Sequence, residues 1–259
     1  MKMRRTVPAL AGLLMLASLV GCKKETVTNI VYANKVDTTG LVVKLLFNGN
    51  YLDSTPYNNT PQVPPGGCTP TTDRFGIQNN AYYFNGYSSY MQIANSPSTD
   101  LKNSFTIAAW IRPDFYPTDS RGIIWHGNAD QGKDPYVLYF KSNGSGSTNL
   151  AVRKDVGDFG NTFNEIVEPG GLYFSKTWMH IVGTFDHVHS IMCLYVNGEL
   201  IIQNTTPFPS NSIGYPTASF WTVIGGYDTN GGLFKGKIDD VYIFNRAISS
   251  SEVKTLFQN

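Results

Sequence analysis

Residues 178–202, WMHIVGTFDHVHSIMCLYVNGELII, contain three short apolar runs at 178–185, 191–196 and 199–202. Asn197 and Gly198 separate the second run from the third. An Asn-Gly pair between two such runs is the strongest short-range signal for a β-hairpin. The runs have strand length and are rich in β-branched and aromatic residues, which favour strands. This stretch therefore predicts antiparallel strands joined by tight turns.

The same pattern of short apolar runs separated by turn-forming residues extends over the chain from residue 41 onward. Clusters of Gly, Pro, Asn, Asp and Ser separate further strand-length runs at 41–47, 81–84, 90–94, 105–111, 122–125, 136–140, 150–152, 220–224 and 237–244. One short helix is expected at the end, where Ser249 and Glu252 have the spacing of a capping box ahead of an apolar face. About a dozen strands and a single short helix predict an all-β, two-sheet antiparallel sandwich.

The composition of the 259-residue chain limits the classes of function. Charged residues make up 15% and the formal net charge is +1, without a basic stripe, so a nucleic-acid partner is not expected. The length suits one all-β domain. Cys68 lies in a Pro- and Gly-rich loop and Cys193 in an expected strand, and the sequence leaves open whether they form a disulfide.

The N-terminus has the pattern of an export signal. Lys2, Arg4 and Arg5 precede an uncharged, mostly apolar stretch at 6–21, which is typical of a secretory signal peptide. The segment 19–22, LVGC, matches the bacterial lipobox and predicts a lipid on Cys22. We therefore expect a signal peptide at 1–21, a polar tether at 22–39 and a folded domain at 40–259, with the membrane contacted through the lipid anchor only.

The residues that follow Cys22 indicate which side of the membrane the protein faces. The triplet 23–25, KKE, resembles the export tags of surface lipoproteins. This favours an outer-membrane lipoprotein that faces the cell surface, with the periplasmic face as the alternative.

Five segments, taken in order, resemble the bacterial laminin-G-like jelly rolls of the concanavalin A-like lectin/glucanase superfamily. They are 41–54 (LVVKLLFNGNYLDS), 81–93 (AYYFNGYSSYMQI), 104–113 (SFTIAAWIRP), 178–200 and 234–248 (FKGKIDDVYIFNRAI). The resemblance implies a concanavalin A-like jelly roll with one concave and one convex sheet. It also implies that ligands are held at the loop rim or on the concave face.

The superfamily includes glucanases, so a catalytic function has to be tested on the residues. Retaining enzymes need two carboxyl groups about 5–5.5 Å apart. The only two neighbouring glutamates, Glu165 and Glu168, have an i, i+3 spacing, which places them on opposite faces of a strand. The sequence therefore predicts that the protein is not an enzyme and has no catalytic residues.

The resemblance also implies a structural calcium ion between the opening loop and the last strand. Carried over to this chain, the ligands would be Asp53 and Asp239, with Asn50 as a third candidate, since Ca²⁺ prefers oxygen ligands. Alternation places Asp239 in phase with Val241 and Ile243, and Asp240 on the other face. The alternative is that Asp239 accepts backbone hydrogen bonds and Asp53 makes a turn.

A ligand surface is expected on four loops, at 113–121, 126–135, 155–165 and 227–232. Aromatic rings beside carboxylates and amides suit sugars, because apolar sugar faces stack on rings while polar groups bind hydroxyls. The candidate ligand-binding residues are Trp125, Asp130, Phe159, Tyr227 and Asp228.

Three functional hypotheses follow, in order of preference. The first is a non-catalytic surface lipoprotein module that binds carbohydrate or matrix glycan. The second is a structural or adhesive module that contacts a protein of the envelope or matrix. The third is a diverged glycoside hydrolase.

Overall fold

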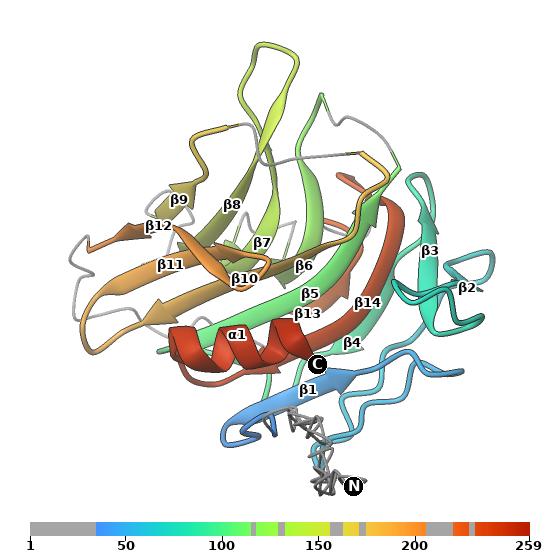
Figure 1. Cartoon of the computed structure of the whole chain (residues 1–259), viewed down its shortest axis with the longest axis horizontal. Coiled ribbons are helices and arrows are strands. Elements are labelled where there is room, and N and C mark those ends of the chain that lie inside the picture. Colours follow the sequence, from blue (N-terminus) through green and yellow to red (C-terminus); the bar gives the residue numbers. More distant parts are fainter. Residues whose placement is uncertain are drawn as a thin grey trace, which may run out of the picture. The chain divides into compact units, whose positions relative to one another are not determined.

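Fourteen strands of the computed structural model form two antiparallel sheets (Figure 1). The structure describes residues 35–114, 118–128, 133–155, 163–170, 175–205, 220–227 and 231–259. The predicted signal peptide and Cys22 lie outside these residues, as does most of the predicted tether. Within them, no helix is long and apolar enough to cross a membrane.

The larger sheet has eight strands in the order β12-β11-β10-β5-β14-β3-β2, and β1 also pairs with β14. Their bounds are β1 Leu41–Leu45, β2 Thr69–Thr71, β3 Ala81–Asn85, β5 Phe105–Pro113, β10 Met179–Asp186, β11 Ile191–Val196, β12 Glu199–Asn204 and β14 Lys235–Phe244. The expected hairpin is present: Val196 pairs with Glu199, and Asn197 and Gly198 both adopt positive φ.

The smaller sheet has six strands in the order β4-β13-β6-β7-β8-β9. Their bounds are β4 Met91–Ala94, β6 Arg121–Asn128, β7 Lys133–Ser142, β8 Thr148–Asp155, β9 Phe163–Val167 and β13 Trp221–Ile224. The sequence analysis did not predict β2 or β9. The three residues of β2 include Pro70, and β9 carries Asn164 and Glu165, so neither has a continuous apolar run.

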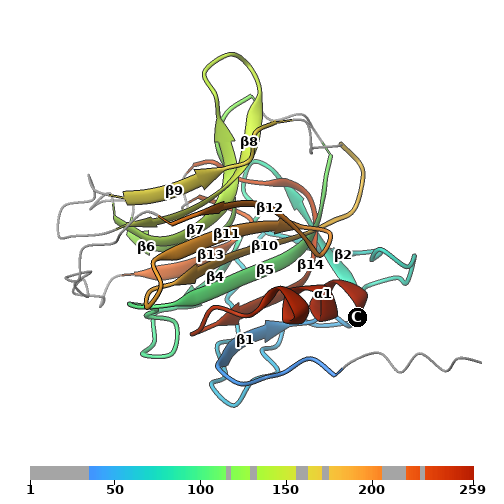
Figure 2. The ribbon, with the colours of Figure 1, turned by 60° about the vertical axis from the view of Figure 1, so that its left-hand side comes forward.

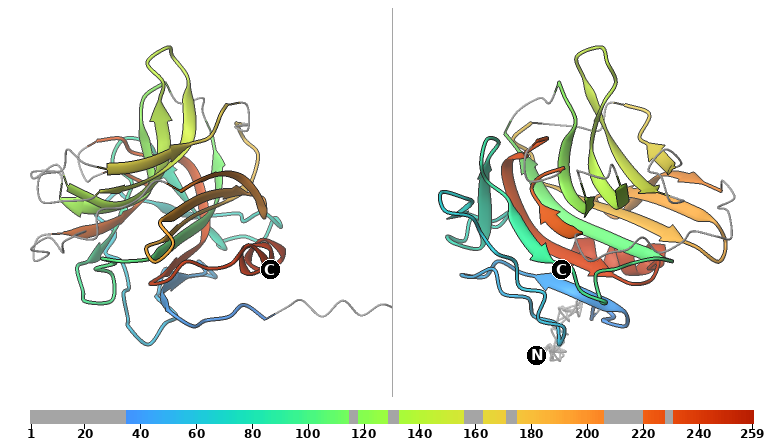
Figure 3. Two further views of the ribbon diagram at one scale, coloured as in Figure 1. Left: turned by 90° about the vertical axis from the view of Figure 1, so that its left-hand side faces the viewer. Right: turned by 180° about the vertical axis from the view of Figure 1, so that it is seen from behind.

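The main core lies between the two sheets, which Figures 2 and 3 show stacked face to face. Alternate residues of each strand supply it: Leu138 and Phe140 of β7 face Ile107 and Ile181 of the larger sheet within one buried cluster. Burial of this apolar surface is the dominant favourable contribution to folding.

Helix α1, Ser250–Gln258, covers part of the outer face of the larger sheet (Figure 1). Val253 and Leu256 of the helix join a second buried cluster with Val182 and Tyr242 of the sheet. The predicted capping box is confirmed, because Ser249 and Glu252 bond each other's backbone N–H groups. Cys68 and Cys193 are both buried and free, so the disulfide alternative is not found.

Gly122 in β6 is required by a close approach of two backbones. A Cβ atom at this position would lie 2.0 Å from the carbonyl oxygen of Gly226. We expect Gly122→Ala to lower the free energy of unfolding by about 1–3 kcal/mol, because the backbone must shift. Urea unfolding measures this, with Val188→Ala at an 82% exposed position as the control that should change stability by less than about 0.5 kcal/mol.

Candidate functional site

The turn between β2 and β3 positions Arg74 next to β14 and Phe75 beside Arg74. The Asp73 carboxylate accepts the backbone N–H groups of Phe75 and Ile77, both at 2.8 Å on Oδ1. Gly76 completes the turn with a φ of 83°, a conformation that glycine adopts without steric cost. The turn thereby holds Arg74 and Phe75 at the edge of the larger sheet.

A β-bulge in β14 places two carboxylates opposite this turn. The register against β5 shifts between Asp239 and Tyr242, and Asp240 has a φ of 45°. The expected strict alternation is therefore wrong at this point. Ile238 and Val241 both face the core between the sheets, because the bulge adds one residue between them. As a result, Asp239 and Asp240 can bind the same partner.

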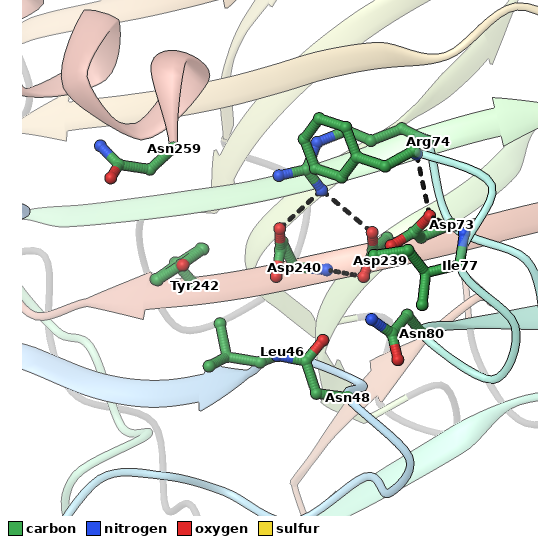
Figure 4. Close-up of a pocket in the computed structure, with 11 residues that line it drawn as sticks. Leu46, Asn48, Asp73, Arg74, Ile77, Asn80, Asp239, Asp240, Tyr242 and Asn259 are labelled. Carbon is green, nitrogen blue, oxygen red and sulfur yellow. Dashed lines mark hydrogen bonds and ion pairs between the residues drawn. The ribbon is translucent and has the colours of Figure 1, made fainter. Parts of the chain in front are cut away.

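That partner is Arg74. Its Nη1 atom lies 3.0 Å from Asp239 Oδ2 and 2.7 Å from Asp240 Oδ2 (Figure 4). The guanidinium also lies over the ring of Phe75, 4.4 Å from the centroid, and over that of Trp110, at 4.6 Å. Arginine suits such a site because its planar group can stack on rings while it binds carboxylates.

The surroundings of Asp239 and Asp240 raise the pKa of both carboxyl groups. Burial and the neighbouring Asp240 carboxylate raise the pKa of Asp239 to about 8, against the opposing effect of Arg74. Burial also raises the pKa of Asp240, again opposed by Arg74. One guanidinium therefore compensates the two buried acids only in part.

These groups line a pocket of about 280 Å³, which we call the Arg74 pocket (Figure 4). At its mouth the side chains of Phe75 and Ile77 are 69% and 53% exposed. Exposed large apolar side chains beside a polar cavity are typical of binding sites. The lining residues are Leu46, Asn48, Asp73, Arg74, Phe75, Ile77, Asn80, Asp239, Asp240, Tyr242 and Asn259.

The predicted calcium ligands bind separate partners. Asp53 accepts the backbone N–H groups of Lys44 (2.9 Å), Thr55 (3.1 Å) and Asn59 (2.7 Å), as in the turn alternative. Asn50 accepts the backbone N–H of Leu52. No group of three His, Cys, Asp or Glu side chains suited to a metal occurs among the described residues. Arg74 supplies the positive charge beside Asp239, and calcium binding stays a prediction.

The structure brings two predicted ligand-binding residues together on the outer face of the smaller sheet. The rings of Trp125 and Tyr227 lie 6.4 Å apart between centroids. Trp125 Nε1 donates to Asp134 Oδ1 at 2.6 Å, and the Tyr227 hydroxyl donates to Asp134 Oδ2 at 2.7 Å. Trp125 is only 3% exposed, so its ring supports Tyr227 instead of offering a face to a ligand.

Arg153 extends this network to a second carboxylate. Its Nε donates to Asp155 Oδ1 at 2.7 Å, and the backbone N–H of Asp134 donates to Asp155 Oδ2 at 2.7 Å. Burial raises the pKa of Asp155 to about 6, although both donors lower it. Phe163, 42% exposed, lies against the Arg153 guanidinium at 4.1 Å. The predicted Asp130, Phe159 and Asp228 lie outside the described residues.

The two neighbouring glutamates bind different partners. Glu165 in β9 accepts from the Tyr139 hydroxyl and pairs with Lys141. Glu168 follows β9, is 1% exposed and accepts the backbone N–H of Gly170 at 2.7 Å.

The sequence pointed to none of Arg74, Phe75 and Arg153 as functional residues, and to Asp134 and Asp155 only as parts of two predicted ligand loops. A weak signal was available for two of them, because Arg153 and Asp155 form part of a charged triplet in a charge-poor, strand-forming chain. Arg74 carried no such signal. Its partners are 165 and 166 residues away, and only the folded chain brings them together.

Residues 84–254 match the model of a laminin-G-type family described as the concanavalin A-like lectin/glucanases superfamily. The chain belongs to this family. The match covers most of the domain and confirms the resemblance carried by the five segments. A comparison with curated protein sequences gives no match.

Solved structures similar to this laminin-G-like chain share its jelly-roll fold. Domain 4 of AbnA, a GH43 extracellular arabinanase from Geobacillus stearothermophilus solved with arabinotriose, aligns with a TM-score of 0.60 and 19% identity, over 83% of this chain and 97% of that domain. The botulinum neurotoxin serotype G binding domain aligns with a TM-score of 0.60 and 19% identity, over 84% of this chain and 50% of that one.

A third similar structure is the binding domain of Paraclostridial Mosquitocidal Protein 1. It aligns with a TM-score of 0.60 and 21% identity, over 84% of this chain and 52% of that one. The chain thus spans about half of each toxin binding domain. At these identities the likeness is one of fold.

Proposed function

We propose that this chain is a non-catalytic module that binds glycan in the Arg74 pocket, carried by a lipoprotein anchored through Cys22. One observation carries the proposal: a ring that is 69% exposed, Phe75, stands at the mouth of a pocket lined by carboxylates and amides. Sugars bind to such sites by stacking an apolar face on the ring while their hydroxyls bond to the polar groups. Arg74 and the Asp73 turn hold Phe75 in place, which limits the entropy lost on binding.

Two of the similar structures agree with a glycan or a protein as partner. The arabinanase domain was solved with arabinotriose, and a botulinum neurotoxin DC binding domain was solved with rat synaptotagmin II. The aromatic mouth and polar lining of the pocket favour the glycan. Capture of an envelope protein at the same pocket would instead support the adhesive alternative.

Phe75→Ala should weaken glycan binding about tenfold, the loss expected for about 1.5 kcal/mol of stacking. Residues from Ala33 onward form one compact unit, so this part of the chain can be screened on a glycan array and titrated with the glycan that binds best. Tyr87→Ala is the matched control, because Tyr87 is 83% exposed but does not line the pocket. Equal weakening by both variants, or by neither, would contradict the placement of the site.

The hydrolase alternative has one observation in its favour, the pair formed by Asp134 and Asp155. Burial raises the pKa of the Asp155 carboxyl to about 6. Against it, both oxygens of each carboxylate already accept hydrogen bonds from Trp125, Tyr227, Arg153 or the chain itself. We therefore expect no release of reducing sugar from polysaccharides by this chain. Turnover that Asp155→Asn abolishes would make the protein an enzyme.

A further inference from the structure

The charges that line the Arg74 pocket do not balance. Asp73, Asp239 and Asp240 face a single lining cation, Arg74. Two lysines act on these acids from outside the lining: Lys44 of β1 on Asp240, and Lys237, which donates to Thr72, on Asp73. The other described lining side chains are amides, a phenol and apolar groups. The lining itself therefore holds three acidic side chains and one basic side chain next to the exposed ring of Phe75.

Two carboxylate oxygens remain as acceptors for a ligand. Asp73 uses Oδ1 for the turn, and Asp240 uses Oδ2 for Arg74. No hydrogen bond among the described residues reaches Asp73 Oδ2 or Asp240 Oδ1. Both residues belong to the pocket lining, so a donor on a bound molecule can reach this side of the site.

We propose that the Arg74 pocket selects sugars that carry a free amino group and rejects acidic sugars. This proposal rests on the proposed glycan-binding function. An ammonium group brings one positive charge and three N–H donors to a site that lacks positive charge and has open acceptors. A uronic or sialic carboxylate would add a negative charge beside the carboxylates of Asp73 and Asp240, which is unfavourable in a partly desolvated pocket.

Proton release provides a supporting readout. A bound ammonium near Asp239 and Asp240 lowers the pKa of both carboxyl groups, because an opposite charge favours their ionised forms. With the pKa of unliganded Asp239 at about 8, binding should release a fraction of a proton at an acidic pH where the amino groups of the free sugar are already protonated. Titration calorimetry in two buffers of different ionisation enthalpy measures this release.

The experiment compares four tetrasaccharides on the protein from Ala33 onward, with EDTA present to remove calcium. They are a β-1,4-glucosamine tetramer, its fully N-acetylated form, the neutral glucose tetramer and a galacturonate tetramer. We expect the glucosamine tetramer to bind at least about tenfold more tightly than either uncharged tetramer, as one added charge-assisted hydrogen bond would give. The galacturonate tetramer should show no binding.

A charge variant separates selectivity from binding itself. Asp240→Asn keeps the left-handed backbone, which Asn tolerates, and should reduce the preference for the amino sugar over the neutral tetramer about tenfold. Asp119→Asn, outside the pocket lining, is the matched control and should leave the preference unchanged. Equal binding of amino, neutral and acidic tetramers would overturn the selectivity but leave the glycan function standing. Binding of none of these sugars, nor of any glycan on the array, would overturn both.

Discussion

Arg74→Ala is expected to lower the free energy of unfolding by about 1–3 kcal/mol at pH 7, because the carboxyl groups of Asp239 and Asp240 lose their shared charged hydrogen-bond donor. The side chains of Arg74 and Asp239 are only 9% and 3% exposed, so water replaces the lost contact poorly. Loss of the guanidinium should also raise the pKa of both carboxyl groups further. Urea unfolding at pH 7 measures the change.

Two further variants separate the charge effect from lost packing. Arg74→Ala combined with Asp240→Asn should recover part of the lost stability, because one of the carboxyl groups left without the guanidinium can then carry no charge. Lys254→Ala breaks the pair with Glu199, whose side chains are 57% and 73% exposed, and should cost less than about 1 kcal/mol. A cost for Arg74→Ala no larger than that of Lys254→Ala would show that the buried ion pair does not stabilise the fold.

The second large effect is a loss of stability in acid through two buried histidines. Burial lowers the pKa of His126 to about 3, helped by Lys154, and that of His180 to about 3, helped by Arg74. His126 Nε2 and His180 Nδ1 are buried without a hydrogen-bond partner, so neither site is prepared to hold a proton. The His126 ring instead stacks on Tyr136, and the His180 ring lies tilted against Trp110.

The direction in which stability changes with pH follows from the number of protons that the folded and the unfolded chain bind. Between pH 6.5 and about 3 the unfolded chain binds a proton at each histidine and the folded chain does not, so stability falls as the pH falls. A shift of this size corresponds to about 5 kcal/mol per histidine at most. Asp239 acts in the opposite sense, because its raised pKa favours the folded state in acid.

Comparing each histidine variant with the unchanged protein isolates the contribution of that histidine to stability, because Asp239 contributes equally to the stability of both proteins. His180→Phe and His126→Phe should each flatten the fall in unfolding free energy between pH 6.5 and 4, as measured by urea unfolding at several pH values. Glu252, whose pKa is lowered to about 2 mainly by Arg246, also loses stabilising free energy as the pH falls below about 5, but by the same amount in every variant. Unchanged slopes in both variants would mean that the histidines are protonated without cost in the fold.

Local patterns in the sequence were enough to predict most of the sandwich. The hairpin at Asn197 and Gly198 and the capping box at Ser249 and Glu252 are both found in the structure. These features depend on residues two or three positions apart, whose backbone preferences hold in almost any context. The strand-length apolar runs likewise predicted the core strands, because β-branched and aromatic residues favour extended, buried segments.

The tertiary structure alone decided the candidate site. Strict alternation separated Asp239 from Asp240, but a bulge at Asp240 turns both toward Arg74, a residue 165 positions away from Asp239. Trp125, chosen from the sequence as a ligand contact, is buried beneath Tyr227 and bound to Asp134. The sequence pattern of a strand indicates which of its faces is apolar. The fold determines which distant side chains meet on that face, because packing and charge compensation act through space between residues that are remote along the chain.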